Sequence, residues 1–221
     1  MDFRFFILSL IALSASAQPA RFEIRDLTQR NLLAIVSDAP LEKMVAQCHL
    51  VRGWMELDPQ ALESGIKGEL EFDTRACETG SGVRDIVLQE KVLDVKEHPL
   101  ASVQVKKWVK ETKGSLTEKS DTAFLAEASV SYRGKTTPLE VPLKLSYFVE
   151  GEKTRKRLPG NLLRISVQIE LTLSTFGVTI PDELKQTLSN KVEVVFDAVG
   201  TSKLPSDKIL LPEGPKPKER T

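Results

Sequence analysis

The sequence contains few of the residues that most often carry out chemistry. It has only two histidines, and its two cysteines do not form a C-x-x-C pair. The G-x-S-x-G, H-E-x-x-H and P-loop patterns are absent, as is a glycine-rich dinucleotide turn. We therefore expect a protein that is not an enzyme, with no bound metal and no catalytic residues.

An excess of either charge is also lacking. The chain has 31 Lys and Arg against 31 Asp and Glu, so its formal net charge is zero. Binding to nucleic acid or to an anionic membrane surface depends on an excess of positive charge. Neither is therefore expected as the main partner.

Long apolar runs are missing as well. The longest, residues 5–13, is too short to span a bilayer, so no stable membrane anchor is expected. It lies in a typical signal peptide, residues 1–17, which ends in the small residues Ala15-Ser16-Ala17. Cleavage after Ala17 would place the protein in the periplasm or outside the cell; a retained N-terminal anchor is the alternative.

The remaining chain divides into one domain and a tail. Residues 202–221 are polar and rich in proline, and they offer little to bury, so we expect a flexible tail there. Residues 18–201 are then left as one domain.

Alternation of apolar and polar side chains runs through this domain. In residues 66–73, for example, the apolar face of the strand alternates with Lys and Glu on the other face. The same pattern, bounded by turn signals, predicts an all-β protein with about eight strands, near 22–37, 42–57, 65–77, 100–111, 121–133, 137–149, 162–175 and 190–200.

Two segments break the alternation. Residues 82–95 place Val83, Ile86 and Val87 at helical spacing behind Ser81, a possible N-cap. Residues 179–191 have Pro181 followed by acidic residues, as at the start of a short surface helix. One or two short helices are therefore expected.

Eight antiparallel strands with one apolar face can form a sandwich or close into a barrel. Several residues on the apolar faces are small, among them Gly68, Ala101, Ala126, Ala128 and Ala198. Small inward residues leave room for a cavity inside a barrel, although they also occur where a barrel narrows.

The two cysteines fall on neighbouring predicted strands. If Leu57 pairs with Lys67 in a hairpin, Cys48 and Cys77 lie nearly opposite each other. This geometry permits a cross-strand disulfide in an exported protein; two reduced, buried thiols are the alternative.

Pro138 and Pro142 are both in the strand near 137–149. Because they are four residues apart, both lack an amide N–H on the same side of the strand. This indicates an edge or a weakly paired seam in the sheet, or alternatively a bulge at Pro142.

The order of several short motifs resembles that of the YceI-like family of bacterial periplasmic proteins. The motifs are Thr79-Gly80, Arg84-Asp85, Leu93-Asp94-Val95, Pro99, Tyr132-Arg133-Gly134-Lys135 and Pro138. The likeness extends from about residue 22 to residue 200. The two cysteines, the charged tail and the irregular first strand depart from the usual family pattern.

The resemblance implies a lipocalin-like, eight-stranded antiparallel barrel, often dimeric, that binds a long apolar chain in its lumen. A polyisoprenoid, an isoprenoid quinone or a fatty-acid derivative would fit this description, and no other cofactor is expected. Alternation then gives the candidate lumen residues Leu70, Phe72, Val103, Val105, Phe124, Ala126, Val141, Leu143, Leu145, Val167, Ile169, Leu171, Val194 and Phe196.

The family pattern places Arg84 and Asp85 near one end of the barrel. They either shape the mouth of the lumen or form a capping and salt-bridge pair. For the whole protein, the alternative function is that of a non-enzymatic structural or interaction protein with a filled barrel core.

Overall fold

A computed structural model of the chain describes residues 19–25, 30–118 and 123–203. The predicted signal peptide, residues 1–17, and nearly all of the predicted tail lie outside these residues, and so those two predictions stay untested.

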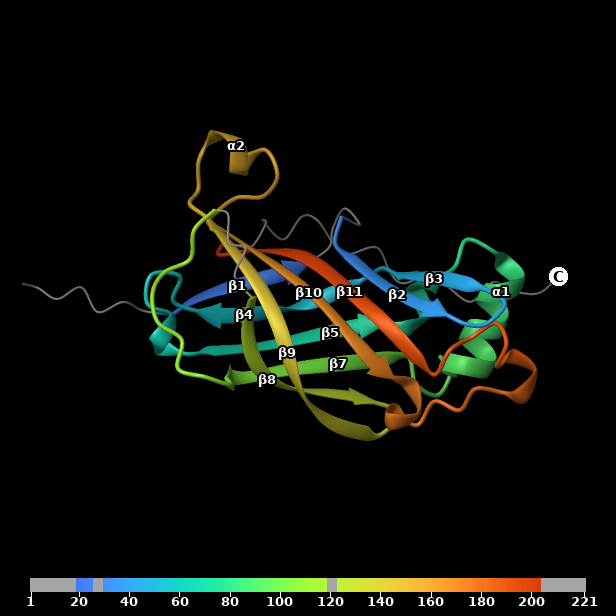
Figure 1. Cartoon of the computed structure of the whole chain (residues 1–221). Coiled ribbons are helices and arrows are strands. Elements are labelled where there is room, and N and C mark those ends of the chain that lie inside the picture. The colour runs from blue at the N-terminus through green and yellow to red at the C-terminus, as the bar shows by residue number, and fades with distance from the viewer. Residues whose placement is uncertain (1–18, 26–29, 119–122, 204–221) are drawn as a thin grey trace, which may run out of the picture.

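The described residues form a single antiparallel sheet with short helical segments (Figure 1). The strands are β1 Ala20–Arg25, β2 Leu32–Asp38, β3 Lys43–Cys48, β4 Val51–Leu57, β5 Ile66–Asp73, β6 Cys77–Glu78, β7 Leu100–Trp108, β8 Ala123–Tyr132, β9 Lys135–Phe148, β10 Leu162–Thr172 and β11 Lys191–Thr201. The helical segments are α1 Gly82–Val87, α2 Glu152–Arg155, the π-helical η3 Leu88–Leu93, and the 3₁₀ turns η1 Leu62–Ser64, η2 Thr74–Ala76, η4 Leu173–Phe176 and η5 Asp182–Leu184.

The sheet closes into a barrel. Its strand order is β1-β4-β5-β7-β8-β9-β10-β11, and β11 pairs again with β1 through Thr201 and Glu23. Along the rest of β11, β2 takes the position of β1, and β3 and β6 follow it. Thus β1 and β2, β3 and β4, and β5 and β6 are halves of three broken strands. The predicted eight-stranded antiparallel barrel is confirmed.

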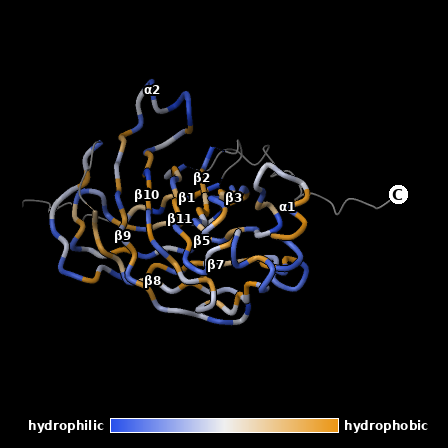
Figure 2. The backbone as a smooth tube through the Cα atoms, turned by 45° about the vertical axis from the view of Figure 1, so that its right-hand side comes forward, coloured by the Kyte–Doolittle hydropathy of each residue, from blue (hydrophilic) through white to orange (hydrophobic). Residues whose placement is uncertain are grey.

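Side-chain alternation positions the core inside this barrel. Figure 2 shows hydrophobic and hydrophilic residues alternating along the strands. On β10, for instance, Leu163 and Ile165 are buried, whereas Arg164 between them is exposed and pairs with Asp197 of β11 at 2.6 Å between Nη2 and Oδ2. The wall is therefore apolar inside and polar outside, as in other small barrels.

The first predicted helix is present, but it buries a different face. α1 continues directly into η3, and the buried side chains are Leu88, Val92 and Leu93. Val83 and Ile86, whose spacing indicated the helix, are 77% and 57% exposed. The π-helical turn changes the angular position of later residues, so a simple 3.6-residue pattern selects the wrong face. The second predicted helix is reduced to the 3₁₀ turn η5.

The predicted register of the β4–β5 hairpin is wrong by one residue. Leu57 pairs with Ile66, and Lys67 pairs with Glu56. Cys48 and Cys77 are nevertheless opposite each other on β3 and β6. The β4–β5 ladder and the β3–β6 ladder therefore differ in register. The change falls at Leu50, which adopts a left-handed conformation with φ 62° between β3 and β4, and at η2, which separates β5 from β6.

The two prolines of β9 lie where the barrel is weakly joined. β8 and β9 pair without a shift from Ala123–Lys144 to Tyr132–Lys135, which contradicts a bulge at Pro142. β9 and β10, in contrast, pair only from Leu162–Phe148 to Val167–Leu143. Both prolines lie at or beyond the end of that ladder, so the seam interpretation is correct.

Candidate ligand-binding cavity

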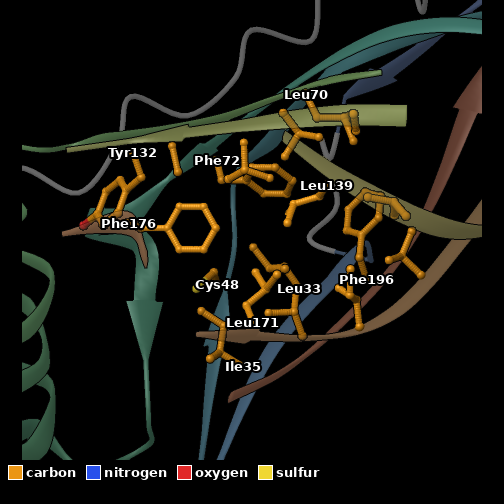
Figure 3. Close-up of a pocket in the computed structure, with 18 of the residues that line it drawn as sticks. Leu33, Ile35, Cys48, Leu70, Phe72, Tyr132, Leu139, Leu171, Phe176 and Phe196 are labelled. Carbon is orange, nitrogen blue, oxygen red and sulfur yellow. The ribbon is translucent and has the colours of Figure 1, made fainter. Parts of the chain in front are cut away.

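A cavity of about 210 Å³ occupies the barrel from its middle toward the end where α1 lies. Side chains from β2 through β11 line it, and the surface that they expose to the cavity is entirely apolar (Figure 3). A space of roughly 10–15 Å³ by this measure holds one water molecule. The cavity is therefore an order of magnitude larger than a water site, and nothing on its wall would hold water in place.

The opposite end of the barrel is filled by side chains. Phe22, Leu57 and Leu116 are buried there. Trp108 closes the space: its indole Nε1 donates a hydrogen bond to the carbonyl of Leu62 at 2.9 Å. The barrel is therefore a pocket with a packed floor rather than a channel.

Most of the residues predicted for the lumen lie on the cavity wall. They are Leu70, Phe72, Val103, Val105, Val141, Leu143, Val167, Ile169, Leu171, Val194 and Phe196. Whether they contact a ligand stays a prediction.

The other three residues predicted for the lumen are Phe124, Ala126 and Leu145, and their contact with a ligand also stays a prediction. All three pack in the core but do not line the cavity. Phe124 lies against Trp108 with the ring centres 5.6 Å apart, in the filled end. Alternation correctly indicates their inward direction, but it carries no information on depth along the barrel axis.

The sequence pattern missed lining residues that come from outside the strands. Leu93 of η3 and Phe176 and Val178, which follow β10, all line the cavity. They belong to segments without a period-two pattern, so no sequence signal placed them. Leu33 and Ile35 of β2 also line it, and alternation on the first strand would have found them.

The two cysteines form a disulfide in the cavity wall. The bond joins Cys48 of β3 to Cys77 of β6, and both residues are buried and line the cavity. It connects the short strand β6 to the sheet where the ladder contains only two residue pairs. The disulfide therefore holds together a part of the wall that has few backbone hydrogen bonds.

Two polar side chains near the end of the cavity where α1 lies form hydrogen bonds to backbone carbonyl groups. The hydroxyl of Tyr132 donates to the carbonyl of Leu93 at 2.6 Å, and the hydroxyl of Thr74 donates to the carbonyl of His98 at 2.8 Å. Burial of the phenol raises the pKa of Tyr132 to about 12. These bonds attach η3 and its following turn to the barrel and leave an apolar surface facing the cavity.

We expect Tyr132→Phe to lower the free energy of unfolding by about 1 kcal/mol, since the substitution removes one buried hydrogen bond to η3. The raised pKa favours the neutral phenol in the folded state. Its contribution to stability is therefore complete below about pH 10 and is lost as the pH rises through about 12. Urea denaturation at pH 8 measures the loss.

An absorbance titration of tyrosinate tests the same environment. In Tyr147→Phe, the matched control, only Tyr132 remains to ionise, because the chain has two tyrosines. At pH 11 we expect about a tenth of it to be ionised, against most of a free tyrosine, whose pKa is about 10. Ionisation of Tyr132 at the ordinary pKa would contradict the described burial and hydrogen bond.

Arg84 and Asp85 lie on α1 at this end of the barrel but not on the cavity wall. Arg84 forms an ion pair with Glu42 in the β2–β3 turn. Asp85 accepts hydrogen bonds from the backbone N–H and the hydroxyl of Thr79, at 2.6 and 2.7 Å. Of the two interpretations, the capping and salt-bridge pair matches these contacts.

The histidines do not gather with other metal ligands. His49 Nε2 lies 3.3 Å from Glu78 Oε1, and His98 packs edge-on against Tyr132. Within residues 19–25, 30–118 and 123–203, no cluster of three His, Cys, Asp or Glu side chains could hold a metal ion. In the same ranges, no helix has the length and apolar character needed to cross a bilayer.

The sequence model for the YceI-like domain matches residues 26–200. The chain belongs to the YceI-like family. Because this match covers most of the chain, the resemblance noted in the sequence is confirmed. A comparison with curated proteins found no match.

Solved structures show the same fold at low sequence identity. BcnA of Burkholderia cenocepacia has a TM-score of 0.59 and 14% identity, over 80% of this chain and 99% of that one. A polyisoprenoid binding domain from Saccharophagus degradans, implicated in plant cell wall breakdown, has a TM-score of 0.59 and 13% identity, over 83% and 99%. A YCEI protein of Campylobacter jejuni has a TM-score of 0.54 and 13% identity, over 70% and 82%. The YceI-like barrel is thus kept at identities where side chains differ widely.

Proposed function

We propose that this YceI-like protein is a periplasmic carrier that holds one long apolar chain in its barrel. The observation that carries the proposal is the cavity wall: every surface that it offers to a ligand is apolar. A ligand with polar groups along its length would lose hydrogen bonds to water there without replacement. The matching ligand is the hydrocarbon part of a polyisoprenoid, an isoprenoid quinone or a fatty-acid derivative.

Binding to such a wall draws its free energy from chain length. Each buried CH₂ group contributes about 0.8 kcal/mol, so a stretch of ten would gain roughly 8 kcal/mol before the loss of translational and rotational freedom. The carrier is therefore expected to discriminate between ligands by the length and shape of their chains, and much less by their headgroups.

The family supports the proposal without identifying the ligand. The similar domain from Saccharophagus degradans is described as polyisoprenoid binding. The proposed location, in the periplasm or outside the cell, rests on the predicted signal peptide at residues 1–17 and its cleavage after Ala17. Catalysis is not part of the proposed role, because the described residues that line the cavity expose no polar groups to it. A homodimer also stays a prediction, to be checked by light scattering.

The alternative, a structural protein with a filled core, fits only half of the barrel. The end near Trp108 is packed, whereas the end near α1 holds the cavity. The presence of this space favours the carrier.

Solvent extraction of the native protein tests the proposed function. The protein is purified from its own host without detergent, extracted with an organic solvent, and the extract is analysed by mass spectrometry. We expect one class of long-chain lipid at close to one molecule per barrel. An extract with no lipid, or with the lipid mixture of the host in trace amounts, would contradict the proposal.

A further inference from the structure

β9 and β10 separate in a part of the wall that faces the cavity. Beyond Val167–Leu143, β10 continues to Thr172 beside β11, and β9 extends back to Lys135 beside β8. Figure 1 shows the two strands diverging from their joined ends near α2. Cavity-lining side chains flank the separation on both sides: Leu139 and Val141 on β9, and Ile169 and Leu171 on β10. We call the region between residues 135–142 and residues 168–172 the slot.

The β8–β9 hairpin determines which residues of β9 direct their amides toward the slot. Both residues of its turn have positive φ, so Tyr132 and Lys135 form the hydrogen-bonded pair that closes a two-residue turn. Backbone groups alternate in direction along a strand, and the amides of even-numbered residues in β9 therefore face β10. Pro138 and Pro142 are both even-numbered. Two of the donors that a continued β9–β10 ladder would use are thus missing.

Side-chain charge also opposes closure of the slot. If the register of β9 and β10 continued, Glu140 would lie directly opposite Glu170. Like charges in that position destabilise a sheet. Glu170 instead pairs with Lys191 of β11, at 3.2 Å between Oε1 and Nζ. Proline placement and charge are independent features, and both keep the strands apart.

A strap, residues 173–180, follows β10 and borders the far end of the slot. Two of its side chains, Phe176 and Val178, are 5% and 2% exposed and line the cavity. Figure 3 shows Phe176 pointing into the cavity beside Tyr132. The strap therefore forms part of the cavity wall although it belongs to no strand.

The strap is held differently on its two sides. On the β11 side, the backbone N–H of Leu173 donates to the carbonyl of Asn190 at 2.8 Å, and Ser174 N–H donates to Asn190 Oδ1 at 2.9 Å. On the β9 side it meets the alkyl stem of Lys135, which passes so close to Gly177 that a Cβ there would stand 3.3 Å from Lys135 Cε. Packing of a flexible lysine stem is more easily undone than a pair of hydrogen bonds.

We propose that the slot is a lateral portal through which an apolar chain passes between solvent or membrane and the cavity. The strap opens it by moving away from β9 while its bonds to Asn190 remain. This inference rests on the proposed function and adds the route by which the ligand enters and leaves the cavity. A sideways route suits a long chain, which would otherwise have to pass end-on between α1, η3 and the barrel rim.

A covalent bridge across the slot tests the portal. The variant Glu140→Cys/Glu170→Cys carries two exposed cysteines on opposite sides of the slot, and a short bis-maleimide joins them. The reagent does not react with the native cysteines, because they are buried and bonded to each other. Uptake and release of cis-parinaric acid, a fluorescent fatty acid, are followed by stopped flow. We expect the bridge to slow both rates by about tenfold or more with little change in Kd, because it blocks a route and not the site.

The matched control is Lys144→Cys/Ser166→Cys, bridged by the same reagent. These residues face each other on the same two strands where the ladder is intact, so that bridge should leave both rates unchanged. Equal rates in the slot-bridged and control proteins would overturn the portal while leaving the carrier function in place. Failure of the unmodified protein to bind the probe or any extracted lipid would instead remove the proposed function, and the portal with it.

A second variant avoids the cross-linker. Pro138→Thr/Pro142→Thr restores the two missing amide donors on exposed or half-buried positions of β9. We expect the strands to pair further and both rates to fall by about fivefold, the equivalent of one net hydrogen bond. Rates equal to those of the wild type would contradict a route through the slot.

Discussion

Replacing Val103 with tryptophan is expected to weaken binding of a long-chain probe by about 30-fold. Val103 lies on β7, and its side chain lines the cavity. The larger ring would occupy space that two or three CH₂ groups of a ligand fill, and each buried CH₂ is worth about 0.8 kcal/mol. Titration with cis-parinaric acid measures the change in Kd.

The control places the same tryptophan on the other face of the same strand. Gln104 is exposed and directly follows Val103, so Gln104→Trp should bind the probe as the wild type does. Both proteins must first show cooperative thermal unfolding, because overpacking alone can destabilise a core. Equal affinities in two folded variants would show that the chain does not lie in the cavity.

Removal of the disulfide should have the largest effect on stability. The bond joins residues 29 apart in sequence, for which the loss of chain entropy in the unfolded state corresponds to about 3.6 kcal/mol. Cys48→Ala/Cys77→Ala keeps the buried positions apolar, so the change isolates the bond from any new polar group. Urea denaturation at constant pH gives the difference in the free energy of unfolding.

Reduction provides an internal control for that variant. A reductant should lower the urea midpoint of the wild type to near that of the double alanine variant, and should not change the midpoint of the variant. A loss below about 1 kcal/mol by both routes would mean that β3 and β6 hold together without the bond, in contrast to the two-pair ladder that joins them.

The architecture could be predicted because alternation in this chain is unusually regular. On β10 an apolar side chain recurs at each odd position from Leu163 to Leu171, which fixes both the strand and its inner face. The sequence interpretation did not resolve the breaks between β1 and β2, β3 and β4, and β5 and β6. The inward positions change from even to odd residue numbers across each break, as from Cys48 to Val51. Left-handed Leu50 separates β3 from β4, and the turn η2 separates β5 from β6, so backbone geometry creates two of the three breaks.

The site was only partly predictable for a related reason. Alternation tells which side chains point inward, and so it found Phe72 and Val194 on the wall. It cannot tell where the barrel is packed and where it is open, which depends on how residues distant in sequence fill the same layer. Leu145 and Ala126 therefore look like lumen residues, but they pack in the core without lining the cavity. Phe176 belongs to the strap, whose sequence has no period-two alternation, and it nevertheless lines the cavity.

The seam shows that local chemistry can reveal a feature of the tertiary structure. Pro138 and Pro142 indicated a side of β9 without amide donors, and the ladder with β10 ends at Leu143. The sequence of β9 alone could not show that this seam borders the cavity. That relation depends on β10 and on the strap, which are brought together only by closure of the barrel.

An electron-density map of the protein purified from its own host tests the carrier function most directly. We expect elongated density, without branches large enough for a polar headgroup, that runs along the cavity past the contacting rings of Phe72 and Phe196 and toward Phe176. A headgroup, where one is present, should lie outside the apolar wall. A cavity that is empty, or closed by rotation of its own side chains in protein that has never met detergent, would contradict the function proposed for this barrel.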